Sequence, residues 1–597
     1  FFSFGVHFAE AAERGFDLIL SNPPWVRAHR WPAAVKSLVR RRYAVCRSPG
    51  WRRGAELAGA PAAAGAQVDL SLLFLERAIR LLAPGGVLAM LFPAKMLRSM
   101  YGAGGRRLLL AETDLVALED HSLDQRAIFR ADAFAAAVVA RKRAGAAPAG
   151  AGVPDRRGDV CDSERRRAGA DATAALPTRD LGATGQYPNT TTQNPGGACR
   201  VTMTRRGVPP LRFEVRAADL SLVPGDPDSP WLLAPPDVAR ALRRMQAAGP
   251  PLGSYATLRV HRGVVTGANA VLLVREARAR LGDLASIRAE GYAAARADGR
   301  GRTEARRYEA VVELDALRPL VRGADISAWR CRTAGWVVWC HDDATAAARP
   351  APPRAARYLA RHADVLRARS GWHPSMPLGA LFRLTPETLQ PKVAWHDLAE
   401  TVKAVALPAR VRSLGRDMPL IPLNTVYFIA APDDDAALLL AALLNSLPVR
   451  TFARAVAERA KDARFRFQAW TMALVPLPPG WSASRTAKAL LRISRDAHRA
   501  GAITPTRQRD LDLAVAGLYG LDSQDMEALA GFDRWLRGQA DIKAGEGGGA
   551  PSTLPDHPGG RPPSPRRPGG GTAGGGVRGA AASSSSSASA RLRGRRR

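Results

Sequence analysis

The sequence predicts an α/β protein in which part of a doubly wound sheet is followed by a second, mixed α/β region. Residues 16–142 alternate short apolar strands with an amphipathic helix. Residues 143–210 lose all periodicity, and residues 211–479 regain short apolar runs separated by Gly and Pro. At 597 residues the chain is long enough for about three or four domains. These observations predict two globular regions joined by a low-complexity linker.

The elements of the first region follow from local patterns. Phe16–Leu20 is a run of apolar or β-favouring residues and is predicted as a buried central strand of a parallel sheet. Asp69–Leu82 places its apolar residues on one helical face, and Pro84-Gly85-Gly86 ends that helix. Further strands are predicted at Val87–Phe92, Leu115–Leu118 and Ala135–Ala140. Together they make the later half of a doubly wound sheet.

The first strand runs directly into Asn22-Pro23-Pro24-Trp25. Two consecutive prolines prevent continuation as a strand or helix. The chain therefore forms a rigid loop at the carboxyl end of the strand, where open α/β sheets place their chemistry. This loop presents an amide, a proline carbonyl and a flat ring, which are the groups needed to hold an exocyclic amino group and stack on its base.

The stretch FDLILSNPPW resembles the catalytic tetrapeptide of S-adenosylmethionine-dependent methyltransferases that modify amino groups. Its Asn-first form is typical of adenine-N6 DNA methylases, whereas Ser-Pro-Pro-aromatic is more usual in cytosine-N4 enzymes. Residues 68–102 and 127–142 are similar to the following segments of large adenine methylases from type IIG restriction–modification and phage-defence systems. Six further segments resemble the target-recognition half of that family: HRGVVTGANAVLLV, LRPLVRGADI, PKVAWHD, LNTVYFI, LLNS and FQAWTMALVPLPP.

The resemblance implies a partial Rossmann-like methyltransferase sheet and a target-recognition domain, acting on double-stranded DNA with S-adenosylmethionine. In such an enzyme the side-chain oxygen of Asn22 and the carbonyl of Pro23 accept the two N–H groups of the adenine N6 nitrogen. Trp25 stacks on the flipped base. Phe129 is expected to sandwich the base against Trp25, and Phe134 is the rival candidate.

Four residues of the second region are candidate DNA contacts. Thr266 and Asn269 can hydrogen-bond phosphates or base edges, although Gly and Asn are also common turn residues. Arg464 and Arg466 lie among aromatic residues together with Gln468. A solvated basic face is the alternative interpretation of these three.

A donor-binding loop is missing from the sequence pattern. Members of the family hold the methyl donor with a glycine-rich loop and an acidic residue. The 21 residues before Asn22 contain no Gly-x-Gly, and GAGGRR (102–107) and AGLYGLD (516–522) lie in unsuitable contexts. We therefore expect an amino-terminally truncated methylase whose dissociation constant for S-adenosylmethionine is weaker than about 1 mM. The residues that would bind this cofactor are unknown. No nuclease cluster is found.

Two other functions stay open at this stage. The chain is a DNA-binding specificity module with a vestigial methylase half, or it methylates RNA or a protein glutamine, because those enzymes share the tetrapeptide. The long target-recognition region argues against the second of these. The absent donor loop is the feature that separates the first from a working methylase.

Composition restricts the partners. A formal charge of +33 and a pI near 11.2 favour a nucleic acid, and part of this charge lies in segments that resemble disordered tails. Five cysteines without a CxxC pair support neither a disulfide framework nor a metal site. The absence of a long apolar run or secretory signal predicts a cytoplasmic, nucleoid-associated protein of prokaryotic type with no membrane partner.

The predicted organisation has five parts. The methyltransferase half is followed by a disordered linker, the target-recognition domain, a helical segment and a disordered basic tail. Their predicted bounds are 1–142, 143–210, 211–480, 481–540 and 541–597.

Overall fold

The computed structural model describes most of the chain as one compact unit. The described residues are 7–9, 14–26, 31–47, 50–59, 68–124, 126, 128–129, 134–144, 197–291, 308–333, 335–478 and 481–539. Most of the predicted linker and the whole predicted tail from residue 541 lie outside the described residues.

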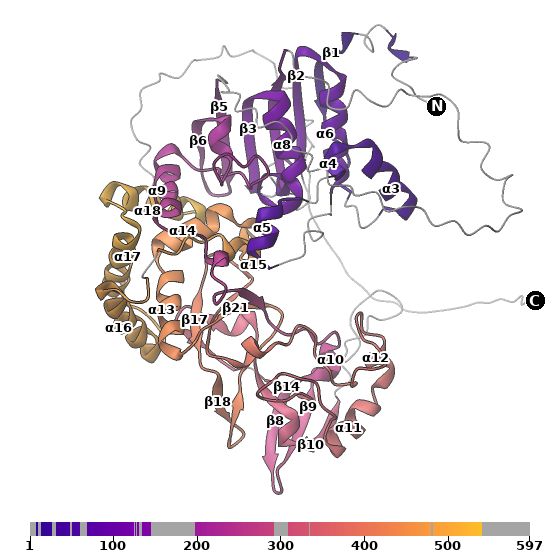
Figure 1. The fold of residues 1–597 in the computed structure, drawn as a ribbon, viewed down its shortest axis with the longest axis vertical. Helices are drawn as coiled ribbons and strands as arrows, with labels where there is room; N and C mark the ends of the chain where they lie inside the picture. The colour runs from indigo at the N-terminus through magenta and orange to yellow at the C-terminus, as the bar shows by residue number, and fades with distance from the viewer. Residues whose placement is uncertain are drawn as a thin grey trace, which may run out of the picture. The chain divides into compact units, whose positions relative to one another are not determined.

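A six-stranded sheet comes first, with strand order β1-β2-β4-β3-β5-β6 (Figure 1). Its strands are β1 Phe16–Ser21, β2 Leu82–Pro93, β3 Thr113–Leu123, β4 Ala135–Lys142, β5 Ala198–Arg205 and β6 Val208–Arg216. β1 pairs with β2, and β3 with β5, in parallel. β4 is antiparallel to both β2 and β3, so the sheet is mixed.

Helices connect these strands and cover them. They are α3 Ala33–Arg42, α4 Ala44–Arg47, α5 Arg52–Leu57, α6 Leu70–Leu81, α7 Lys95–Arg98 and α8 Ala103–Glu112. α6 begins where the Asp69 carboxylate accepts a hydrogen bond of 3.0 Å from the backbone N–H of Ser71, which satisfies a free donor of the first turn. α6 packs on β2 and α8 on β3. The helix predicted over 69–82 and the α/β fold class are confirmed.

Two predictions about this sheet are wrong. β1 is an edge strand of the described sheet, not a buried central one, and Leu18 and Leu20 are 56% and 72% exposed. Among the described strands only β2 pairs with β1, so the other edge of β1 has no partner among them. The linker predicted over 143–210 ends too late, because β5 and the first three residues of β6 lie within it. Cys199, Val201 and Met203 are buried at alternate positions, as expected for a strand.

The second region contains two larger sheets. One has the order β10-β9-β8-β14-β11-β20 and the other β17-β15-β21-β7. The first consists of β8 Leu273–Arg280, β9 Leu284–Ala289, β10 Glu309–Glu313, β11 Leu317–Val321, β14 Trp336–Val338 and β20 Ile421–Pro422. The second consists of β7 Val260–Arg262, β15 Lys392–His396, β17 Ala404–Leu407 and β21 Val426–Ala430. This mixed architecture agrees with the predicted fold class.

Smaller β-structures complete the second region. One is a three-stranded sheet, and two are hairpin-like pairs. Their strands are β12 Ile326–Ser327, β13 Arg330–Cys331, β16 Leu398–Ala399, β18 Arg410–Ser413, β19 Arg416–Pro419, β22 Glu458–Ala460 and β23 Arg464–Arg466. In the three-stranded sheet β23 lies between β16 and β22.

The remaining helices include the predicted helical segment. They are α9 Pro236–Ala248, α10 Asn269–Leu272, α11 Pro353–Ala360, α12 Ala363–Arg367, α13 Asp434–Leu444, α14 Leu447–Val456, α15 Ala469–Ala473, α16 Arg485–Ala500, α17 Pro505–Tyr519 and α18 Ser523–Arg537. α18 packs against α9 and α14. One hydrophobic core contains Leu118, Trp395 and Trp535, so the sheet of β1–β6, the second region and the terminal helices share buried surface.

No single helix among the described residues is long and apolar enough to cross a membrane; α13 and α14, bent by 69°, meet these criteria only as a pair.

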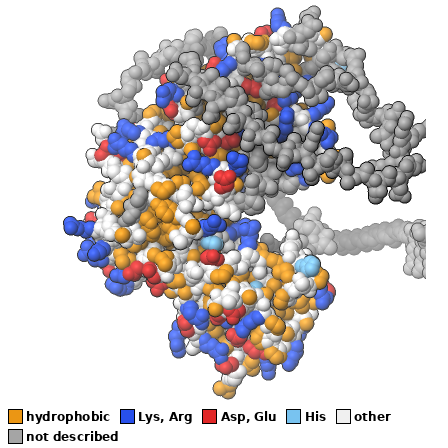
Figure 2. Space-filling model, in the orientation of Figure 1, with side chains coloured by type: hydrophobic (Ala, Val, Ile, Leu, Met, Phe, Trp, Pro, Cys, Tyr) orange, Lys and Arg blue, Asp and Glu red, His pale blue; other side chains and the backbone are white. Residues whose placement is uncertain are grey.

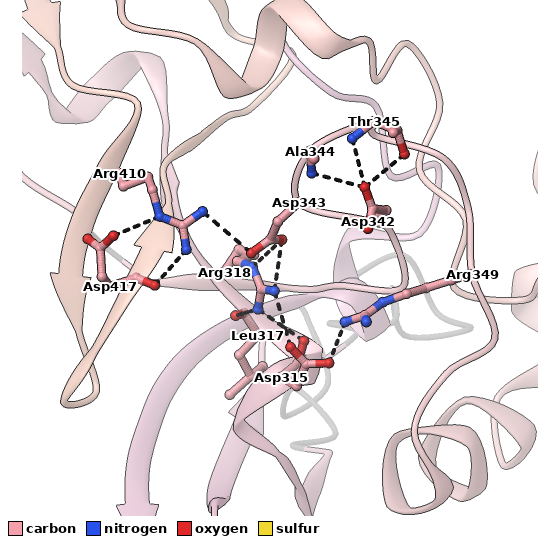
Figure 3. Close-up of polar contacts among 10 residues, drawn as sticks. All are labelled: Asp315, Leu317, Arg318, Asp342, Asp343, Ala344, Thr345, Arg349, Arg410 and Asp417. Atoms are coloured by element: carbon pink, nitrogen blue, oxygen red, sulfur yellow. Dashed lines mark hydrogen bonds and ion pairs between the residues drawn. The ribbon is translucent and has the colours of Figure 1, made fainter.

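Charge is distributed rather than concentrated. Figure 2 shows Lys and Arg side chains scattered over the face in view, with Asp and Glu side chains among them. One dense ion-pair network lies beside β11 and the β18–β19 pair (Figure 3). There Asp343 pairs with Arg318 at 2.8 Å and with Arg410 at 3.7 Å, while Asp315 pairs with Arg318 and Arg349. Arg410 also contacts Asp417 at 2.7 Å, which links β18 to β19.

Candidate functional site

The loop after β1 is held at both ends. Ser21, its last strand residue, is in register with Met90 of β2. At the exit, the carbonyl of Val26 accepts a hydrogen bond of 2.9 Å from the N–H of Leu70, which ties the loop to the start of α6. Pro23 is buried, while Asn22 and Pro24 are exposed. No hydrogen bond joins the Asn22 side chain to another described residue, so its amide oxygen is available to a ligand.

Trp25 and Phe129 lie in direct contact. Their ring centroids are 5.4 Å apart, and the rings meet edge to face at 88°. Phe129 follows the end of β3, so segments about one hundred residues apart in the chain bring the two rings to the same edge of the sheet. Their edge-to-face contact leaves no room for a base between them. A base must therefore stack on one ring or separate the pair, and the expected sandwich of the base between Trp25 and Phe129 stays a prediction.

The indole nitrogen of Trp25 is buried and has no hydrogen-bond partner in the described structure. A buried indole N–H normally finds an acceptor. This donor therefore supports a polar ligand at the loop.

Phe134 has a structural position. Its side chain packs against the main hydrophobic core, and its carbonyl accepts a hydrogen bond of 2.7 Å from the N–H of Ala94. Of the two aromatic candidates, Phe129 is the one that the structure places against Trp25.

The residues present do not form a cradle for a methyl donor. No glycine-rich turn joins a strand of the first sheet to a helix within the described ranges. The glycines of GAGGRR serve packing, because a Cβ on Gly104 would lie 3.0 Å from Cα of Val45, and one on Gly105 only 2.7 Å from Cδ2 of Leu72. Gly520 of AGLYGLD has φ of 64° and ends α17. A donor site is therefore not assignable to these residues.

Thr266 and Asn269 form a local turn. The Thr266 hydroxyl donates to the Asn269 side-chain oxygen just before α10, and Thr266 is only 1% exposed. Its carbonyl accepts a hydrogen bond of 2.9 Å from buried Arg369. These contacts give Thr266 a role in the turn and leave Asn269, which is exposed, as the accessible member of the pair. DNA contact by either residue stays a prediction.

Arg464 and Arg466 belong to a basic group on β23. Arg464 is exposed and Arg466 half-buried, and both lie close to the His396–Asp397 pair. Burial lowers the pKa of His396, Asp397 opposes this, and Arg464 and Lys403 lower it further. The imidazole is therefore held neutral near pH 7. Gln468 lies just beyond the strand, where α15 begins.

Arg262 is a member of this group that the sequence did not single out. Its guanidinium lies 5.9 Å from the centre of the Tyr427 ring and donates to the carbonyl of Asn424 at 2.8 Å. Burial raises the pKa of the Asp397 carboxyl, and His396, Arg262 and Arg466 partly offset this. Strand pairing of β7 with β21 places Arg262 here, which is a long-range effect that no local pattern reveals.

A cleft of about 330 Å³ opens where the first sheet meets the β22–β23 turn. Its lining is mainly charged: Leu123, Asp124, Arg126, Arg206, Lys461, Asp462 and Ala463. Leu123 ends β3, so this cleft lies at the end of the strand that precedes Phe129. No cluster of three potential metal-ligating side chains occurs within the described ranges.

Comparison with known proteins shows that the first region is similar to one family. Residues 2–129 match the family described as Eco57I restriction-modification methylase. No curated protein matches the sequence.

Solved structures are similar over most of the chain at low identity. The type IIL restriction-modification enzyme MmeI, solved in complex with DNA, has 11% identity and a TM-score of 0.48 over 87% of this chain and 57% of its own. The type IIG restriction endonuclease BpuSI has 12% identity and a TM-score of 0.28 over 87% of this chain and 54% of its own. A nuclease-deletion mutant of the type ISP enzyme LlaGI, with a DNA substrate mimic, has 9% identity and a TM-score of 0.37 over 83% and 43%. The chain thus spans little more than half of the first two enzymes.

Proposed function

We propose, from the match of residues 2–129 to a restriction-modification methylase family, that this chain holds the target base and selects the DNA site in adenine-N6 methylation. The methyl donor implied by the family is S-adenosylmethionine, which supplies an electrophilic methyl group. The observation that carries the proposal is the loop after β1. There the exposed Asn22, whose side chain makes no hydrogen bond to a described residue, lies three residues before Trp25, whose ring is 5.4 Å from that of Phe129.

Asn22 and Pro23 act on the amino group of the base. The N6 nitrogen is a weak nucleophile because its lone pair is delocalised into the ring. Acceptance of its two N–H groups by the Asn22 side-chain oxygen and the Pro23 carbonyl draws the nitrogen toward tetrahedral geometry. The lone pair then projects out of the ring plane. Because Val26 is tied to Leu70, these acceptors are positioned before the base arrives, which is the basis of electrostatic preorganisation.

Trp25 and Phe129 hold the flipped base. Extraction of a base from the duplex costs a few kcal/mol, and stacking on an aromatic ring returns about 1–3 kcal/mol. Entry of the base between the rings requires the edge-to-face pair to open. The second region, with Arg262, Arg464 and Arg466 near one another, is the proposed contact to the DNA around that base.

Base flipping can be tested without the methyl donor. Duplexes that bind best are first selected from a randomised pool, and 2-aminopurine then replaces each adenine of the selected site in turn. We expect a rise in fluorescence at one position, which Trp25→Ala and Phe129→Ala abolish while duplex affinity changes less than about threefold. Phe134→Leu is the matched control. Equal fluorescence at all positions with the wild-type chain would exclude base flipping by this loop.

A second candidate function is a DNA-binding specificity module without transfer activity. The lack of a glycine-rich donor turn among the described residues favours it. Calorimetry with S-adenosylmethionine separates the two: a dissociation constant weaker than about 1 mM supports a chain that needs a separate donor-binding part, whereas micromolar binding contradicts the absence of a donor site.

A further inference from the structure

The residues that line the charged cleft between the first sheet and the β22–β23 turn lie close in the chain to a cluster of arginines. Three cations, Arg126, Arg206 and Lys461, line the cleft together with two carboxylates, Asp124 and Asp462. Three of the lining residues lie one or two positions after buried or half-buried polar side chains in the chain. Arg205 precedes Arg206, Ser122 precedes Leu123, and Arg459 lies two residues before Lys461.

Arg98 and Asp120 form a buried ion pair on the sheet side of this junction. Arg98, at the end of α7, is 1% exposed and contacts the Asp120 carboxylate of β3 at 2.7 Å. Burial tends to raise the pKa of Asp120, but Arg98, Arg459 and the hydrogen bonds from Ser122 outweigh it and lower that pKa. Asp120 is thus ionised. Nε and one terminal nitrogen of Arg98 are buried without a hydrogen-bond partner.

Arg459 is a buried arginine on the β22 side of this junction. Its Nη1 donates to the carbonyls of Arg454 and Ala457 at 2.6 and 2.9 Å, and its guanidinium lies 4.6 Å from the centre of the Phe465 ring. The side chain is 4% exposed. Its Nε and Nη2 have no hydrogen-bond partner. These contacts fix the position of the side chain, while its Nε and Nη2 donors are not used by another described residue.

Positive charge is in excess at this junction. Arg98 and Arg205 both lie within electrostatic range of Arg459, and the carboxylates near these arginines are the buried Asp120 and the exposed Glu400 beside Arg205. Arg205 also has two buried nitrogens without a hydrogen-bond partner among the described residues. Buried charges without counter-charges are destabilising. An anion that accepts hydrogen bonds from several guanidinium groups removes that cost.

We propose that this junction, formed by Arg98, Arg205 and Arg459 together with Arg206 of the cleft, is a phosphate-binding site between the first sheet and the second region. Guanidinium groups match phosphate oxygens in geometry as well as in charge. The phosphate is either a backbone phosphate of bound DNA or a free phosphate group. Occupation of the site by a DNA phosphate rests on the proposed function, whereas the existence of a phosphate-binding site does not.

A bound phosphate at this place has a mechanical consequence. It contacts α7 and β5 on one side and β22 on the other, so its binding fixes the second region against the sheet that carries the Asn22 loop. Site selection by the second region and base placement at the loop are then coupled through one ligand.

The first test measures thermal unfolding of the full chain in rising inorganic phosphate, with chloride used to hold the ionic strength constant. We expect a saturable rise in melting temperature of about 2–5 °C. Phosphate also stabilises proteins in a general, non-saturable manner. Arg206→Ala, an exposed substitution, should shift the saturation point to at least tenfold higher phosphate. Arg412→Ala, an exposed arginine on β18, is the matched control and should leave it unchanged.

A second variant keeps the test decisive if one substitution harms folding. Arg459→Lys keeps the charge but loses the planar donors, and it should weaken phosphate binding with native circular dichroism retained. The absence of a saturable rise in the wild-type chain, or its persistence in both Arg206→Ala and Arg459→Lys, would overturn the proposal.

The source of the phosphate is distinguished by DNA binding. If a DNA phosphate occupies the site, Arg206→Ala should reduce the slope of log affinity against log salt by about one. If the slope is unchanged while the thermal response is lost, the occupant is a free phosphate. A wild-type chain that binds no duplex would contradict the proposed function and leave the thermal test of this site intact.

Discussion

At the residue scale, the loop after β1 shows how little sequence is needed to place an acceptor. Two prolines end the strand, and the hydrogen bond from Leu70 to Val26 fixes the exit. Asn22 is left exposed with an unused amide. The tetrapeptide was therefore sufficient to predict where the loop lies. It was insufficient to predict the edge-to-face contact of Trp25 and Phe129, because that contact depends on how β1 and β3 are arranged in the sheet.

Lys392 is a second residue whose environment decides its chemistry. It lies on β15, is 0% exposed, and its ammonium nitrogen has no hydrogen-bond partner. Burial lowers its pKa to about 7, and Asp434 only partly opposes this. Between about pH 7 and the ordinary lysine pKa the unfolded chain binds more protons than the folded one. Stability contributed by this group therefore rises with pH across that window.

Lys392→Met should remove that pH dependence. We expect the variant to be more stable at pH 7 by roughly 1–4 kcal/mol and to approach the wild type near pH 10. Urea unfolding at pH 7 and pH 10 measures the difference. An identical difference at both pH values would show that Lys392 is not neutralised by burial.

At the element scale, local patterns predicted individual helices and strands but not which strands pair with one another. α6 was predictable because its apolar spacing and Asp69 cap are both local. The antiparallel insertion of β4 between β2 and β3 was not, because strand order depends on contacts between distant segments. β5 was missed because its alternating Cys199, Val201 and Met203 are separated by polar residues in an Arg- and Thr-rich stretch. Arg262 was missed because the pairing of β7 with β21, which places it, also joins segments that are distant in the chain.

The ion-pair network of Figure 3 gives a prediction at this scale. Asp343→Ala removes the residue that joins buried Arg318 to Arg410 of β18. We expect a loss of about 1–3 kcal/mol in unfolding free energy, because Arg318 stays buried with fewer partners. Asp417→Ala removes an exposed partner of Arg410 and should cost less than about 1 kcal/mol. Equal losses in chemical denaturation would contradict a central role for Asp343.

At the scale of the whole molecule, the charge of +33 and the shared core decide how the function must be tested. Leu118 of β3 and Trp395 of β15 belong to one hydrophobic cluster, so separation of the two regions would expose core surface. Sequence preference is better measured in the full chain, with variants of the loop.

We expect Trp25→Ala to leave the preferred DNA sequence unchanged while base flipping is lost.

The affinity of the full chain for duplex DNA should fall steeply with salt, because Lys and Arg contacts to phosphates release counterions. Preference for one short sequence should persist at moderate salt, since each base-edge contact discriminates by about 1–3 kcal/mol. Removal of residues after Lys543 should lower affinity for all sequences alike and reduce the salt slope. Loss of preference on that removal would move specificity to the terminal segment.

The measurement that tests the account most directly is the identity of the methylated base. The chain is extended at its amino terminus with a donor-binding methylase segment and incubated with S-adenosylmethionine and duplex DNA, and the nucleosides are analysed by mass spectrometry. We predict N6-methyladenine at one short sequence, with the rate reduced about 10²–10³-fold by Asn22→Ala and DNA affinity nearly unchanged. Formation of N4-methylcytosine, or an undiminished rate with Asn22→Ala, would contradict the role assigned to Asn22.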